Sequence, residues 1–72
     1  MNPHVEQPLV SIVSINYNGA RVTCEMLESL RRITYPNIEV IIVDNASAED
    51  PSVIVQEHPW ITFIRSDKNL GF

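Results

Sequence analysis

Three short polar segments follow the three most apolar stretches of this 72-residue sequence. Residues 16–19 (Asn-Tyr-Asn-Gly) follow the first stretch, residues 44–47 (Asp-Asn-Ala-Ser) the second, and residues 67–72 the third. Their amide, carboxylate, hydroxyl and phenol groups can hydrogen-bond to a small ligand or stack on it. If the apolar stretches are parallel strands, all three segments meet beyond the carboxyl ends of the strands, where open α/β sheets bind ligands.

Each segment has a possible role in holding a nucleotide. Tyr17 can stack on a base with little loss of rotamer entropy. Asp44 can accept a hydrogen bond from a ribose hydroxyl or a base N–H, and the Asn45 amide can match two neighbouring atoms of a pyrimidine such as uracil. Asn69, together with Leu70 and Gly71, can bring backbone amides close to a phosphate.

Purely structural interpretations compete with each of these roles. Tyr17 can pack between a helix and the sheet, and Asp44 and Asn45 can form turns or cap a helix with their short polar side chains. Residues 69–71 can be an ordinary turn.

The spacing of apolar residues predicts the strands and helices that position these three segments. Residues 9–15 and 38–44 are short β-branched runs typical of strands buried on both faces, and residues 60–66 indicate a third, partly alternating strand. Residues 20–33 have a helical period with Asn18 as a plausible N-cap. Asp50 followed by Pro51 predicts the start of a short helix that ends near residue 58, although Ser47 is an alternative cap.

Strands and helices that alternate in this way predict an α/β fold with a parallel sheet and right-handed crossovers. The expected architecture is a Rossmann-like β-α-β-α-β half with strand order 3-2-1. Residues 1–8 are expected to be disordered or extended, and residues 9–72 to form the N-terminal, nucleotide-binding part of a truncated domain. The first strand then has an unpaired outer edge, so we expect the chain to self-associate.

Composition excludes several other classes of function. The net charge of −4 argues against nucleic acid as a partner. With two glycines, Gly19 and Gly71, the sequence has no dinucleotide or P-loop motif. Cys24 is expected to be a buried, inert thiol, and His4 and His58 are isolated residues expected at the surface, without metal-ligand spacing. Residues 1–8 lack the pattern of a secretory signal, so a cytoplasmic location is expected.

Three motifs together carry a resemblance to a known family. Residues 10–19 (VSIVSINYNG), 43–47 (VDNAS) and 69–72 (NLGF), in that order, resemble the opening of family 2 glycosyltransferases with the GT-A fold, most closely the branch that includes rhamnosyltransferases. The resemblance covers nearly the whole chain from residue 9. It implies a parent enzyme of polysaccharide assembly that transfers a sugar from a nucleoside-diphosphate sugar to a carbohydrate or lipid-linked acceptor.

The resemblance also implies which residues contact the donor. Carried over by position, the nucleotide-sugar-binding residues are Asn16, Tyr17, Asn18, Asp44, Asn45 and Asn69. Many family members have a second acid where this chain has Asn45, a difference that favours uridine or thymidine over guanosine. A divalent metal, Mg or Mn, is expected for the parent enzyme.

The ligands of that metal belong to an Asp-x-Asp element beyond the third strand and are not in this sequence. The catalytic base and the acceptor-binding half are not in it either, so the isolated chain is expected to be inactive. The resemblance leaves room for a parent enzyme that is peripheral at the inner membrane.

Two other classes of function stay open at this point. One is a non-catalytic nucleotide-binding or regulatory module of flavodoxin-like architecture. A phosphorelay receiver would need an acidic cluster at the end of the first strand, where this chain has Asn16, Tyr17 and Asn18. The other is a purely self-associating α/β fragment.

Overall fold

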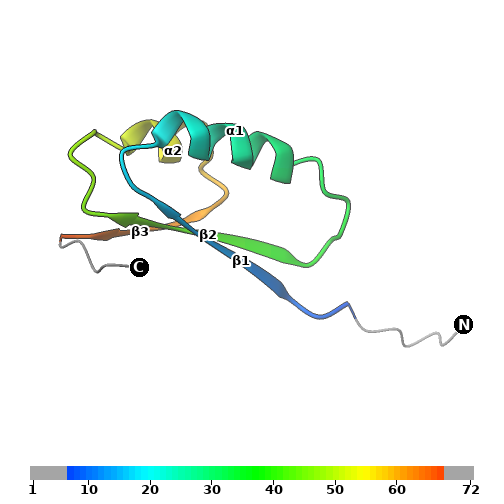
Figure 1. The fold of residues 1–72 in the computed structure, drawn as a ribbon. Helices are drawn as coiled ribbons and strands as arrows, with labels where there is room; N and C mark the ends of the chain where they lie inside the picture. The colour runs from blue at the N-terminus through cyan, green and yellow to red at the C-terminus, as the bar shows by residue number, and fades with distance from the viewer. Residues whose placement is uncertain (1–6, 68–72) are drawn as a thin grey trace, which may run out of the picture.

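The computed structural model describes residues 7–67, in which strands and helices alternate (Figure 1). This order confirms the α/β fold predicted from periodicity. The elements are β1 (Val10–Asn16), α1 (Ala20–Leu30), β2 (Ile38–Asn45), α2 (Ser52–Glu57) and β3 (Thr62–Ser66).

The three strands form one parallel sheet. Val10 of β1 pairs with Ile38 of β2, and Ile41 of β2 pairs with Thr62 of β3. The order β1-β2-β3 is the predicted order 3-2-1 read from the opposite edge. The central position of β2 agrees with its β-branched sequence, because a strand with neighbours on both sides is the most buried of a sheet.

Both helices lie on the same side of the sheet (Figure 1). Two crossovers of the same hand that advance in the same direction across a sheet place their helices in this way. The core between the layers consists of five buried apolar residues, to which α1, β2 and α2 all contribute: Ala20, Leu27, Val40, Ile42 and Ile54. Within residues 7–67, neither helix is long and apolar enough to cross a membrane.

The other side of the sheet carries a second set of apolar side chains. Ile12 of β1 and Phe63 of β3 pack against the core on the helix side. Since successive side chains of a strand point to opposite faces, the residues between these positions point away from the helices. We call this surface the open sheet face, and it comprises Val13, Ile15, Ile41, Val43 and Ile64. Parallel sheets are ordinarily covered on both faces, yet Val13 is 61% exposed and Ile64 is 49% exposed.

The start of α1 differs from the prediction. Gly19, not Asn18, occupies the N-cap position, and no side-chain cap bond is made there. The backbone N–H of Ala20 instead donates to Glu49 Oε1 at 2.9 Å. The acceptor for the first turn therefore comes from the loop after β2, which sequence spacing cannot reveal.

Two other helix boundaries also shift by a few residues. The helical pattern continues past Leu30 because Arg32 and Ile33 form tight turns, in which their N–H groups donate to carbonyls three residues earlier. At α2 the predicted start is one residue early. Pro51 stands at the N-cap, and Asp50 Oδ1 accepts a hydrogen bond from the Ser52 N–H at 3.0 Å.

Candidate functional site

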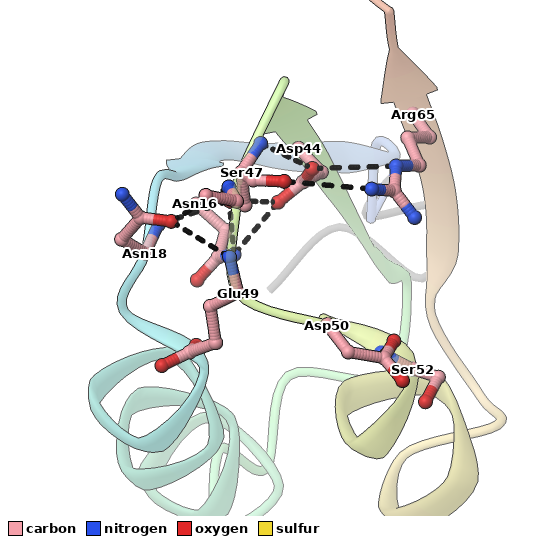
Figure 2. A network of polar contacts seen from close by, with 9 residues as sticks. Asn16, Asn18, Asp44, Ser47, Glu49, Asp50, Ser52 and Arg65 are labelled. Carbon is pink, nitrogen blue, oxygen red and sulfur yellow. Dashed lines mark hydrogen bonds and ion pairs between the residues drawn. The ribbon is translucent and has the colours of Figure 1, made fainter.

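The carboxyl ends of the strands bring the first two polar segments together. Asn16 pairs in register with Asp44, and Asp44 pairs with Arg65 of β3. Figure 2 shows the side chains from the loops after β1 and β2 pointing toward one another at this edge. Sequence reasoning predicted this convergence of residues 16–19 and 44–47. Asn69, the predicted contact in the third segment, lies outside the described residues.

Asp44 is the centre of a buried polar network. Its side chain is 0% exposed. Oδ1 accepts hydrogen bonds from Asn16 Nδ2 at 2.8 Å and from Ser47 Oγ at 2.6 Å, and Oδ2 accepts one from the Ser47 N–H at 3.1 Å (Figure 2). The Arg65 guanidinium adds an ion pair, with Nε 3.8 Å from Oδ2. Both carboxylate oxygens are therefore occupied by the protein itself.

These partners decide the ionisation state of Asp44. Burial by itself raises the pKa of a carboxyl group, because it disfavours the charged form. The hydrogen bonds from Ser47 and Asn16 and the charge of Arg65 act in the opposite direction and prevail, so the pKa of Asp44 lies below its ordinary value. Asp44 is thus a charged acceptor at neutral pH.

Asn16 connects the end of β1 to both neighbouring segments. It is 1% exposed, and its Oδ1 accepts a hydrogen bond from Thr23 Oγ1 of α1 at 2.6 Å. With its amide hydrogens on Asp44, Asn16 is held in one orientation between sheet and helix. Thr23 was not predicted as a member of the site, and Ser47 was predicted only as part of the segment 44–47 or as a helix cap. The Thr23 hydroxyl becomes informative only once the packing of α1 on the sheet is known.

The loops after β1 and β2 exchange hydrogen bonds with each other. The Asn18 N–H donates to Ser47 Oγ at 2.9 Å, and Asn18 Oδ1 accepts from the N–H groups of Ala48 and Glu49 at 2.9 and 3.0 Å. Glu49 in turn accepts from the Ala20 N–H. Glu49 is a further residue that sequence reasoning missed, because its partner is 29 positions away.

Two residues of these loops have left-handed backbone conformations. Asn18 has a φ of 50° and Ala46 a φ of 55°. Asparagine tolerates this region, whereas the Cβ of alanine makes it unfavourable by roughly 1–2 kcal/mol. Such conformations persist where surrounding interactions fix them, and they concentrate at functional sites. The hydrogen bonds of Asn18 and of Ser47, which follows Ala46, supply that constraint here.

Tyr17 and Asn45 differ from the other predicted site residues. The structural interpretation of Tyr17 required its ring to pack between helix and sheet. Tyr17 is 54% exposed, so the ring does not pack there. Asn45 is 6% exposed and pairs in register with Ser66 at the end of β3. The edge therefore presents an exposed aromatic ring beside a hydrogen-bonded, charged and largely buried framework. This arrangement suits the binding of a flat, polar ligand.

Comparisons with known proteins place the sequence in a family. Residues 11–72 match the family model described as glycosyl transferase family 2. An uncharacterized glycosyltransferase of Rickettsia prowazekii is 39% identical over 54 residues, which are 75% of this chain and 17% of the relative. Chondroitin synthase of Escherichia coli is 40% identical over 68 residues, which are 89% of this chain and 10% of the synthase.

The putative glycosyltransferase EpsH of Bacillus subtilis is 41% identical over 54 residues, or 75% of this chain and 16% of EpsH. The chain thus spans less than a fifth of the length of each of these relatives. None of the three is described as a rhamnosyltransferase, so that narrower resemblance stays a prediction.

The Asp44 network predicts a pH-dependent contribution to folding. Asp44→Asn keeps the shape of the side chain but removes the charge and directs an amide group at the Ser47 and Asn16 donors. We expect a loss of about 2–3 kcal/mol in the free energy of unfolding at neutral pH. Because the folded-state pKa is lowered, ionised Asp44 stabilises the fold above its unfolded-state pKa of about 3.9 and ceases to do so as the pH falls through the folded-state value.

Urea denaturation followed by circular dichroism, at neutral pH and near pH 3, measures both effects. The difference between wild type and Asp44→Asn should shrink at the lower pH. Asp67→Asn, which removes the same charge from an exposed residue, is the control. Equal losses in the two variants, or a difference that is independent of pH, would contradict the assignment.

Proposed function

Because this chain belongs to glycosyl transferase family 2, we propose that it forms the nucleoside-binding part of an enzyme that transfers a sugar from a nucleoside-diphosphate sugar. The observation that supports this most directly is the meeting of the β1 and β2 loops around buried Asp44, with Tyr17 exposed beside them. A carbohydrate or lipid-linked molecule is the proposed acceptor. One relative is named a chondroitin synthase, which favours a growing polysaccharide.

The predicted contact residues divide into two groups by the role that we propose for them. Tyr17 is exposed and can stack on the base, whereas the proposed amide contact of Asn45 with the base or ribose requires its buried side chain to become accessible. Asn16, Asn18 and Asp44 contribute by holding the loops in place, since their polar atoms are engaged with Thr23, Ser47 and neighbouring backbone. For Asp44 to accept a hydrogen bond from the nucleoside, one of its present hydrogen bonds, from Asn16 or Ser47, must break.

A framework that is already rigid before the ligand arrives loses less conformational entropy on binding. This is the contribution we assign to the buried network. A pyrimidine such as uracil presents an N–H flanked by carbonyls, a pattern that one amide side chain matches. We therefore propose a uridine or thymidine diphosphate sugar as the donor, in preference to a guanosine one. The predicted contact of Asn69 with a phosphate belongs to the same proposal.

The residues described at this edge do not fit the divalent metal that the family implies. Magnesium and manganese take oxygen ligands in near-octahedral geometry. Both Asp44 oxygens are engaged by protein donors, and Glu49 Oε1 accepts from the Ala20 N–H. We propose that the ligands of a Mg or Mn ion lie outside residues 7–67. A cytoplasmic location, with the parent enzyme peripheral at the inner membrane, also remains a proposal.

Nucleotide titration tests the donor site. Uridine and thymidine diphosphates should produce saturable NMR shifts at Tyr17 and in the Asp44 network at millimolar concentrations, and guanosine diphosphate should bind more weakly. Tyr17→Ala should lower the affinity roughly tenfold, because base stacking on an aromatic ring contributes about 1–3 kcal/mol.

Tyr35→Ala is the matched control, because this tyrosine lies in the loop before β2, at the amino end of the strands. Shifts that do not saturate, or equal losses in the two variants, would count against the proposed site.

A turnover assay tests the expected inactivity of the 72-residue chain. Incubation with a range of nucleoside-diphosphate sugars, acceptor glycans and Mg or Mn should release no nucleoside diphosphate above background. The reason is that the metal ligands, the catalytic base and the acceptor half are all expected beyond these residues. Sustained release that is proportional to chain concentration would show that the chain is catalytically sufficient.

Self-association is the second function that a specific observation favours. The open sheet face leaves five aliphatic side chains without a covering layer within the described residues. In a longer polypeptide, further chain can cover this face, and in the isolated chain a second copy can do so. Removal of such an area from water contributes about 25 cal/mol for each Å² buried.

Val13→Lys tests this association. A charged side chain on the open sheet face is costly to bury, so sedimentation equilibrium should show an association constant at least about tenfold lower than that of the wild type. Val22→Lys is the control, because Val22 is a similarly exposed valine on α1. A monomeric wild type, or equal weakening by both variants, would contradict association through this face.

A further inference from the structure

His58 has an unusual environment at the end of α2. The sequence places it as an isolated surface residue, but the structure buries it completely, so that expectation was wrong. Its Nδ1 accepts a hydrogen bond from Trp60 Nε1 at 3.3 Å, while Nε2 is buried without a hydrogen-bond partner within residues 7–67. Glu28 Oε1 of α1 lies 3.5 Å from this nitrogen. Buried polar atoms in this condition are rare in native proteins and often mark a site for a water or an ion.

Two further potential ligands surround the imidazole. Cys24, Glu57 and His58 each present a ligand atom, and these atoms lie within 4.8 Å of one another. Cys24 and Glu28 are one turn apart on α1, while Glu57 and His58 are consecutive at the end of α2. The four side chains therefore come together only through the packing of α1 against α2, and for this reason their sequence spacing gave no metal motif.

The charges of this group favour a cation. Burial raises the pKa of the Cys24 thiol, and the nearby carboxylates of Glu57 and Glu28 raise it further. Two acidic groups thus lie close enough to the thiol to act on its charge, and Nε2 of His58, 3.5 Å from Glu28 Oε1, makes no hydrogen bond within residues 7–67. A divalent cation reverses this repulsion and stabilises a coordinating thiolate.

We propose that Cys24, Glu28, Glu57 and His58 form a binding site for a zinc-like divalent cation that ties α1 to α2. A sulfur, an imidazole nitrogen and two carboxylate oxygens are ligands that zinc takes in tetrahedral sites. Magnesium and manganese prefer an all-oxygen environment, so this site is chemically distinct from the one expected on the sugar donor.

The ligand atoms of Cys24, Glu57 and His58, which lie within 4.8 Å of one another, need only a modest contraction to hold an ion. A tetrahedral zinc ion holds its ligand atoms roughly 3.3–3.8 Å apart. The Glu28 side chain is 58% exposed and Glu57 is also exposed, so both carboxylates are free to move toward the ion while the buried imidazole stays in place.

Ion binding must also change the Trp60 hydrogen bond. If Nδ1 of His58 binds the ion, it can no longer accept from the indole. If Nε2 binds the ion, the remaining proton of the neutral imidazole sits on Nδ1, where it opposes the indole N–H. With either nitrogen as the ligand the indole is released, and Trp60, which is 41% exposed, has room to turn.

Binding releases a proton from the thiol. The S–H bond of Cys24 breaks, its proton passes to solvent, and the sulfur lone pair forms the bond to the ion. The affinity for the ion should therefore rise with pH. No oxidant or other reactant is needed.

Titration of the reduced 72-residue chain with Co²⁺ and then Zn²⁺ tests the proposal. Cobalt should give a thiolate charge-transfer band with one-to-one stoichiometry, zinc should displace it, and both ions should change Trp60 fluorescence. Zinc should also raise the urea midpoint. Cys24→Ser should abolish the charge-transfer band and weaken zinc binding at least about tenfold, and Glu28→Gln should weaken zinc binding to a smaller extent.

Two control variants test whether zinc binding is specific to these four side chains. Glu25→Gln removes a neighbouring exposed acid on α1 that pairs with Arg21, and it should leave zinc binding unchanged. His4→Gln removes the other histidine of the sequence and should also leave it unchanged. The absence of a charge-transfer band, zinc binding that survives Cys24→Ser, or its loss in either control variant would each overturn the proposal. Nucleotide binding by Tyr17→Ala is a separate measurement, so the two proposals can fail independently.

Discussion

The structure of the strand ends depends on one interaction, the hydrogen bonding of the fully buried Asp44 carboxylate by Asn16 and Ser47. A buried carboxylate without partners is unfavourable by several kcal/mol, so the fold must bring donors to it. Asn16 lies opposite Asp44 in the sheet register, and Ser47 follows Asp44 by three residues through a tight turn. The position of both loops is thus a consequence of where one charge is buried.

The burial of Asp44 also constrains the backbone of the two loops. Ser47 uses its hydroxyl to donate to Asp44 and to accept from the Asn18 N–H, so the loop after β1 is fixed by the loop after β2. The left-handed conformations of Asn18 and Ala46 let the chain turn sharply enough to make these bonds. Tyr17 lies between Asn16 and Asn18, both of which are held, and this is why an exposed ring can have a defined place at the edge.

The sequence predicts the frame of this arrangement better than its contacts. The β-branched runs and the helical period give the order of elements and the parallel sheet, and hence the meeting of Asn16 with Asp44. They do not give the bond from Ala20 to Glu49, because a local N-cap at Asn18 satisfies the same sequence signal. They also do not give the burial of His58, which depends on how closely α1 and α2 pack. Pairings between residues about 30 positions apart are properties of the packed structure, and no spacing rule encodes them.

The two faces of the sheet follow from the same strand period. Every second residue of β1 and β2 points toward the helices, and along this side the sequence changes from Ile12 and Ile42 to Asn16 and Asp44 at the carboxyl ends. The helix side therefore becomes polar at the edge where the loops cross, and its hydrogen bonds are satisfied by those loops. On the opposite side Val13 and Ile15 are aliphatic almost to the end of the strand. The aliphatic middle of that side lies between two polar pairs, Ser11 with Glu39 at one end and Asn45 with Ser66 at the other, so an apolar surface with a polar rim suits it.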